Sequence, residues 1–137
     1  MCVYVELYEA FDNAENINVY NNGEMNVYGA GSEEFGKILK SWKTMTEGAH
    51  DMPAFGVSLN SETLKSLKSG VWVEFDFGKV YESNGMPYEK LLINVQKSSY
   101  GFNLIRYNSQ GGYYGRCFYY DLVGYNMDEF YDILQIL

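Results

Sequence analysis

Short turn sequences between alternating apolar runs constrain this chain more than any other feature. Three turn signals divide such runs: Asn22-Gly23, Asn84-Gly85 and Gly111-Gly112. The runs that they join cover residues 17–20 and 25–28, then 71–77 and 88–97, then 102–107 and 114–122. Asn-Gly between apolar runs is the strongest short signal for a β-hairpin. Strands joined by such short turns pair antiparallel, so the pattern favours hairpins over βαβ crossovers.

Helical periodicity appears after the first hairpin and again at the C-terminus. Ser32 is an N-cap residue, and Glu33 and Glu34 occupy the first turn, where the helix dipole favours acids. The stripe behind them repeats at helical spacing: Phe35, Ile38, Leu39, Trp42 and Met45. A second stripe follows Asn126: Met127, Phe130, Tyr131 and Leu134. Between the two, we expect Asn60 to cap a short helix that ends at Gly70.

The N-terminal residues alternate in a strand pattern. Val3, Val5 and Leu7 alternate with polar or aromatic residues, which predicts a strand over residues 2–8. The chain has 137 residues, of which 47% are hydrophobic, enough for one domain with a real core. The sequence therefore predicts a single α+β domain over residues 1–137. Its antiparallel sheet combines an N-terminal hairpin with a C-terminal β-meander, and two to three α-helices pack on it.

Charge limits the class of partner. The chain carries 18 acids and 10 bases, a net charge of −8. The first 36 residues contain no base and seven acids: Glu6, Glu9, Asp12, Glu15, Glu24, Glu33 and Glu34. Nucleic-acid phosphates and anionic membranes need a basic footprint, so we expect neither as a direct partner. No apolar run approaches the length of a membrane span and no basic leader precedes one, which predicts a cytoplasmic protein.

Three patterns resemble reaction or cofactor sites, and each has a simpler interpretation. Gly29-Ala30-Gly31 stands between a strand and a helix, but two acids occupy the helix start where a phosphate would bind. His50 and Asp51 could assist Cys117 as a nucleophile, although nothing in the sequence brings them together. Two cysteines and one histidine are too few for a disulfide framework or a zinc site of usual spacing. We predict no cofactor and no bound metal.

Glu74 and Asp76 form the remaining candidate for chemistry. Residues two apart on a strand project from the same face about 7 Å apart, a separation that suits glycoside hydrolysis or a hard cation. Ordinary alternation on a half-exposed strand explains the same pair without any function. A small enzyme that uses these two carboxylates is therefore a minor alternative, and we predict that the protein is not an enzyme.

Tyrosines concentrate in the last two expected strands and their turns. Seven lie in this region: Tyr100, Tyr107, Tyr113, Tyr114, Tyr119, Tyr120 and Tyr125. One helical layer covers one face of a sheet, so we expect some of these rings to be exposed unless loops and the second helix cover the other face. Exposed tyrosines are favoured at protein interfaces because they supply contact area at low entropic cost. A symmetric homodimer is a further possibility for such a surface.

The profile as a whole indicates a binding protein. In size, charge and aromatic content it resembles small acidic inhibitors of the anti-CRISPR, anti-restriction and toxin-immunity types, classes that share no common motif. The resemblance implies an inhibitor that occludes a basic nucleic-acid-handling partner, with acids that mimic nucleic-acid charge. We expect Glu6, Glu9, Asp12 and Glu15 to steer the partner, and Tyr113, Tyr114 and Tyr120 to anchor it. The alternative is a small-molecule-binding domain with a Tyr- and Trp-lined pocket between sheet and helices.

Overall fold

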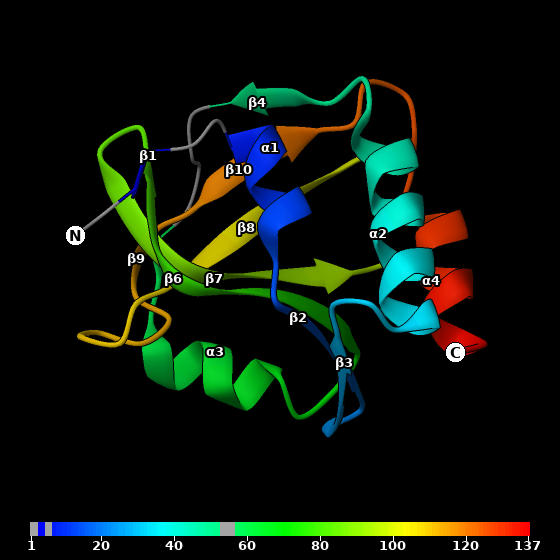
Figure 1. Ribbon diagram of the computed structural model, residues 1–137, viewed down its shortest axis with the longest axis horizontal. Coiled ribbons are helices and arrows are strands. Elements are labelled where there is room, and N and C mark those ends of the chain that lie inside the picture. The colour runs from blue at the N-terminus through cyan, green and yellow to red at the C-terminus, as the bar shows by residue number, and fades with distance from the viewer. Residues whose placement is uncertain (1–2, 5–6, 53–56) are drawn as a thin grey trace.

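The chain folds as an α+β domain built on one strongly twisted sheet (Figure 1). The computed structural model describes residues 3–4, 7–52 and 57–137. Strand order in the sheet is β3-β2-β6-β7-β8-β10-β4, and β1 pairs with β6 outside this path. The strands are β1 (Val3–Tyr4), β2 (Asn16–Asn21), β3 (Glu24–Gly29), β4 (His50–Met52), β6 (Val71–Ser83), β7 (Met86–Val95), β8 (Gly101–Tyr107) and β10 (Phe118–Asp121). A separate ribbon pairs β5 (Val57–Ser58) with β9 (Gly115–Arg116).

Two of the three expected hairpins are present with their expected turns; β8 also pairs antiparallel with β10, but β10 begins at Phe118, not directly after the Gly111-Gly112 turn. β2 pairs antiparallel with β3 around Asn22-Gly23, and β6 pairs antiparallel with β7 around Asn84-Gly85. All four turn residues have positive φ, as two-residue hairpin loops of this class require. β6 also pairs with β2, so it joins the N-terminal hairpin to the meander. A register shift between Asp76 and Tyr81 bends β6, which lets one long strand serve both parts of the sheet.

The helices α2 (Glu33–Thr46) and α4 (Asp128–Gln135) cover one face of the sheet together with the short helices α1 (Leu7–Ala10) and η1 (Phe11–Asn13). The apolar stripe of α2 points inward as predicted. The centroid of the Trp42 ring lies 4.9 Å from that of Phe75 on β6 and 5.7 Å from that of Phe130 on α4. Ser32 Oγ accepts a hydrogen bond from the Phe35 amide, 3.2 Å, which confirms the predicted N-cap. These contacts form the main hydrophobic core.

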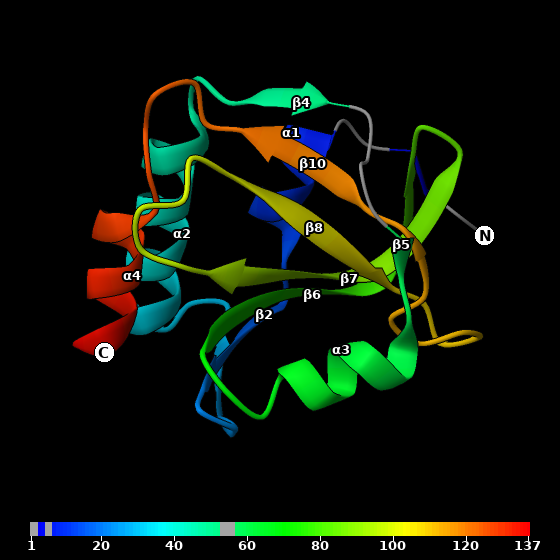
Figure 2. The ribbon, with the colours of Figure 1, turned by 180° about the vertical axis from the view of Figure 1, so that it is seen from behind.

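The second face of the sheet is covered by α3 (Asn60–Ser66) and by the loop 108–114 (Figure 2). A smaller apolar cluster lies there, made of Leu67, Trp72, Leu92 and Tyr113. Asn60 does not cap α3: its Oδ1 accepts a hydrogen bond from the Tyr113 amide, 3.0 Å, and so ties the helix to the loop. The helix also ends at Ser66 instead of continuing to Gly70.

The predicted strand over residues 2–8 is wrong at Leu7 and Tyr8, and residues 2, 5 and 6 of that range lie outside the described residues. β1 covers Val3–Tyr4 and pairs in parallel with Tyr81 and Glu82 of β6, while the chain is helical from Leu7. A helical spacing was present in the sequence: the buried positions are Leu7, Ala10, Phe11 and Ala14. Phe11 packs 4.8 Å from Trp42 and 4.9 Å from Phe75 in the core. The free energy gained by burying the Phe11 ring outweighs the strand preference of the short alternating run before it.

Candidate functional site

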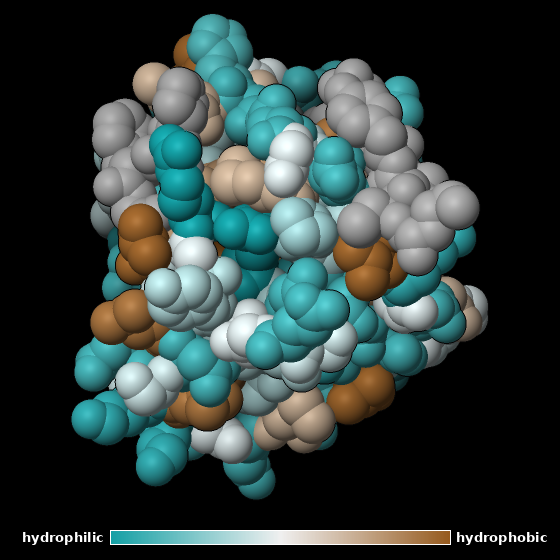
Figure 3. Space-filling view, turned by 90° about the vertical axis from the view of Figure 1, so that its left-hand side faces the viewer, coloured by the Kyte–Doolittle hydropathy of each residue, from teal (hydrophilic) through white to brown (hydrophobic). Residues whose placement is uncertain are grey.

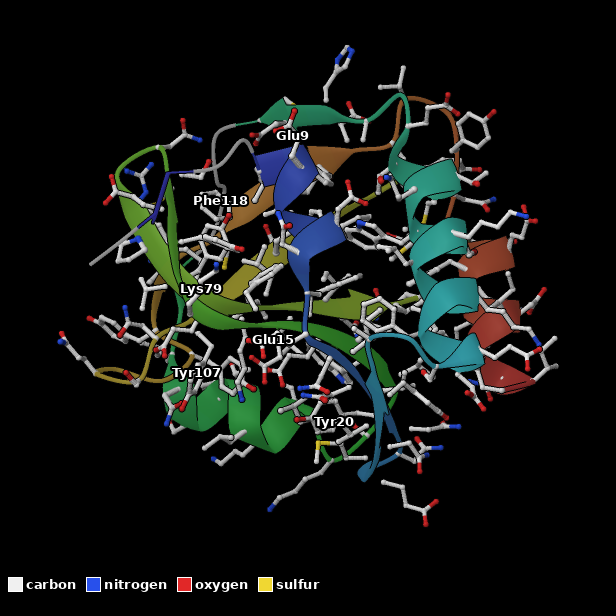
Figure 4. The ribbon with its side chains drawn as sticks, in the orientation of Figure 1. Glu9, Glu15, Tyr20, Lys79, Tyr107 and Phe118 are labelled. Carbon is white, nitrogen blue, oxygen red and sulfur yellow. The ribbon has the colours of Figure 1, made fainter. Side chains whose placement is uncertain are left out.

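The N-terminal acids lie on the outside of the segment that crosses the main core. Because α1 and η1 bury their apolar side, Glu9 and Asp12 point to solvent. Glu15 is exposed where the chain enters β2, and Figure 4 shows it on the same side of the molecule as Glu9. Glu6 lies outside the described residues. Three of the four acids that we expected to steer a partner are therefore located, and all three are exposed.

Intramolecular ion pairs neutralise only part of this acidic segment. Lys43 of α2 pairs with Asp12 at 2.7 Å, and Lys37 pairs with Glu33 one turn away at 3.4 Å. Four of the segment's described acids form no ion pair within 4 Å with a described residue, and Glu9, Glu15 and Glu24 are exposed, whereas the fourth, Glu34, is half-buried. The three exposed residues are called the open acids below. They represent charge that the fold leaves available to another molecule.

Glu15 lies against β6. Its carboxylate occupies the space beside Gly78 that a Cβ would need, and its amide donates to the Asp76 carbonyl at 2.8 Å. Lys79 follows Gly78 but stands over the Tyr81 ring, 5.5 Å from its centroid. Gly78, with φ of +69°, allows this approach, because a side chain there would clash with the carboxylate.

The structure corrects two of the three expected tyrosine anchors. Tyr113 and Tyr120 are only 5% and 2% exposed, so their rings are not available to a partner in this conformation. Tyr120 lies on the inner row of β10 with Phe118, and Tyr113, which belongs to the loop 108–114, is buried in the smaller apolar cluster with Trp72. Tyr114 is 60% exposed, so its role as a contact residue stays a prediction. Tyr100 and Tyr125 are also exposed, in agreement with the expectation that some rings would be.

Glu74 has a different environment from the half-exposed strand that we expected. It lies on the same face of β6 as Asp76, as predicted, but it is 1% exposed. Asn18 Nδ2 donates to Glu74 Oε1 at 2.9 Å, Tyr20 Oη donates to the same oxygen at 3.5 Å, and Tyr113 Oη donates to Oε2. This group, Glu74 with Asn18, Tyr20 and Tyr113, is called the Glu74 cluster below. Its donors satisfy a buried carboxyl group and hold the loop 108–114 on the sheet.

The two tyrosines of the Glu74 cluster are held in the neutral form. Burial raises the pKa of Tyr113 well above its usual value, and the charge of Glu74 adds to this effect. The same two causes raise the pKa of Tyr20 to about 12. Neutral hydroxyls are hydrogen-bond donors, which is what the Glu74 oxygens require. The cluster therefore fits a structural role at the centre of the second face.

The other chemical candidates are separated or buried. His50 pairs with Asp121 across β4 and β10. Asp121 is four residues from Cys117, which corresponds to roughly 13 Å at the rise of a strand. Cys117 is buried, and burial raises its thiol pKa, which disfavours the nucleophilic thiolate. Gly29-Ala30-Gly31 forms the strand–turn–helix junction between β3 and α2. Within the described residues no group of three or more acidic, histidine or cysteine side chains is placed to hold a metal ion.

Aromatic side chains fill the region where a ligand pocket was the alternative prediction. Between the sheet and α3, Tyr107 and Tyr113 stack edge-on with centroids 5.0 Å apart, and Trp72 packs in the same cluster. A groove of about 250 Å³ lies between α2 and α4, and Tyr125 is one of its lining residues. The face that carries the β6–β7 hairpin is mostly hydrophilic, with scattered apolar residues (Figure 3). No helix in the described ranges is long and apolar enough to cross a membrane.

No family model, curated protein or solved structure matches this chain.

Proposed function

We propose that the protein is a non-enzymatic binding protein that attaches to a basic, nucleic-acid-handling protein in the cytoplasm and occludes its binding surface. The observation that supports this most is the set of open acids. Glu9, Glu15 and Glu24 come from three neighbouring parts of the chain and lack a basic partner within 4 Å in the described structure. Acidic side chains left without counter-charge attract basic surfaces from a distance and raise the rate of encounter.

The mechanism is charge-steered blocking. The open acids take the positions that phosphates would occupy on the partner, and the body of the domain then excludes nucleic acid by its bulk. Tyr114 is the one expected tyrosine anchor that remains exposed, and its ring supplies contact area. Asp12 contributes less than the open acids, because Lys43 already neutralises it.

Affinity capture followed by an inhibition assay tests this function. The tagged protein is used to capture partners from a lysate of its source, or of that source's host, at low and at moderate salt. We expect one basic nucleic-acid-handling protein in near-stoichiometric amount, with recovery falling as salt increases. The purified protein should then inhibit nucleic-acid binding or cleavage by that partner. Absence of such a partner, or a captured partner whose activity is unaffected, contradicts the proposal.

A further inference from the structure

β3 is the last strand at one end of the sheet. Figure 1 shows it at the rim, beyond β2, and no described strand pairs with its outer side. Its first four residues, Glu24 to Val27, are all exposed. The opposite edge strand, β4, has three residues, whereas β3 has six. β3 is therefore the longer open edge of the sheet.

Turn geometry decides which backbone groups of β3 face outward. In a two-residue hairpin the residues that flank the turn, here Asn21 and Glu24, bond to each other, and bonding alternates from there. Ala30 belongs to the bonded set, and its amide donates to the Glu15 carbonyl at 2.9 Å, as this alternation requires. Met25 and Val27 belong to the other set, so their amides and carbonyls point away from β2.

The side chains of the same two residues form a small apolar strip. Met25 and Val27 are 50% and 55% exposed, and they share a face of the sheet with Tyr20 and Asn18, the residues opposite them on β2. The strip is therefore continuous with the Glu74 cluster. Natural sheets usually protect an open edge with lysine, proline or a bulge. β3 contains neither lysine nor proline, and its pairing with β2 is regular.

Acids stand at both ends of the edge. Glu24 begins β3, and the end of β3 lies beside Glu15 and leads into Glu33 and Glu34 of α2. Two of these four residues are open acids. One lysine lies near the turn end of β3. The backbone of Lys68, which follows α3, lies against Gly23: its carbonyl oxygen is 3.3 Å from the position that a Cβ on Gly23 would take. The balance along the edge is nevertheless acidic.

We propose that the outer edge of β3 is the docking strand, and that an extended basic segment of the partner adds to it as a further strand. The segment would place apolar side chains on Met25 and Val27, and lysine or arginine beside the acids at the two ends. A second copy of this chain fits less well. Antiparallel pairing of two β3 strands would bring Glu24 of one copy toward Glu15 and Glu33 of the other. This proposal deepens the proposed function and rests on it.

A synthetic peptide tests the edge without knowledge of the partner. The probe is a fluorescent peptide of about ten residues in which lysine and valine alternate, a length typical of one strand. Its control is the same peptide N-methylated at every backbone amide, which keeps the side chains and their charge but removes the donors on both edges of the strand. We expect the N-methylated peptide to bind at least about tenfold more weakly in fluorescence anisotropy.

Two variants with the same change of charge locate the binding site. Met25→Lys places a lysine on the edge, and Leu64→Lys places one on α3 at a residue that is 48% exposed, close to the value for Met25. Met25→Lys should weaken peptide binding about tenfold, and Leu64→Lys by far less. In amide hydrogen exchange, the peptide should slow Met25 and Val27, while Asn26, already bonded to β2, should change little.

The outcomes separate this proposal from the proposed function. Equal binding of both peptides, or equal loss in both variants, overturns the edge proposal and leaves simple charge attraction intact. No binding of the alternating peptide also overturns it. Self-association in sedimentation that Met25→Lys abolishes would assign the edge to a second copy and overturn it as well. The proposed function fails separately, if no basic partner is captured or inhibited.

Discussion

Replacement of Tyr113 by phenylalanine removes one hydroxyl from the Glu74 cluster and leaves the ring in place. Tyr113 Oη donates to Glu74 Oε2, and Glu74 is almost completely buried, so water cannot replace the lost donor. A buried polar group left without its partner costs about 1–3 kcal/mol. For a domain of this length, a loss of 2 kcal/mol corresponds to a decrease in Tm of about 6–10 °C.

Urea unfolding followed by fluorescence measures this loss, with Tyr114→Phe as the matched control. Tyr114 is the adjacent residue and is exposed, so its hydroxyl should contribute less than about 0.5 kcal/mol. Equal stability of the two variants would refute the reasoning that Tyr113 holds the loop 108–114 on the second face.

The same variant carries a pH signature. The folded pKa of Tyr113 is raised above the unfolded value of 10.0, so the folded state keeps its proton where the unfolded state loses it. The associated stability is fully present below pH 10 and is lost as pH rises above it. Tyr113→Phe lacks this loss, so its stability should fall less steeply than that of the unmodified protein above pH 10. Parallel alkaline slopes for the two proteins would contradict this assignment.

Three further changes have defined expectations. Tyr88→Phe should leave stability unchanged or raise it by up to about 1 kcal/mol, because the buried Tyr88 hydroxyl has no hydrogen-bond partner in the described structure; a loss above that amount in urea unfolding would contradict this. Ser32→Ala should cost about 1 kcal/mol, because the cap of α2 is lost, and thermal unfolding together with circular dichroism would show it. Asp12→Asn should change stability by less than about 1 kcal/mol, because its pair with Lys43 is exposed; a larger loss in urea unfolding would give that pair a structural role.

Local patterns predicted the elements whose signals lie within a few adjacent residues. Asn22-Gly23 sets the first hairpin and its register, and Ser32 with the stripe behind it sets α2. The N-terminal segment was harder, because Val3, Val5 and Leu7 alternate while Leu7, Ala10 and Phe11 repeat at helical spacing. Only the fit of Phe11 against Trp42 and Phe75 decides between the two patterns. That contact joins residues far apart in the chain.

Predictions about exposure failed where they depended on which face the helices cover. Period-2 alternation placed Glu74 and Asp76 on one face, which is correct, but it could not show that α3 and the loop 108–114 enclose that face around Glu74. Because the sequence did not show which faces of the sheet are covered, Tyr113 and Tyr120 were chosen as surface anchors. The alternation of Phe118, Tyr119 and Tyr120 was a usable signal, because it puts Tyr120 on the same face as the more apolar Phe118. The base-free acidic segment required no tertiary information to be recognised.

The rate of association with the captured partner shows whether the open acids attract it. The double variant Glu9→Lys with Glu15→Lys reverses two open acids, and Glu62→Lys with Glu129→Lys makes the same change of charge on α3 and α4. Stopped-flow measurements at low and moderate salt should show association slowed about tenfold in the first variant, with a flatter salt dependence, and much less in the second. Equal rates in the two variants would mean that net charge alone, and not the open acids, attracts the partner.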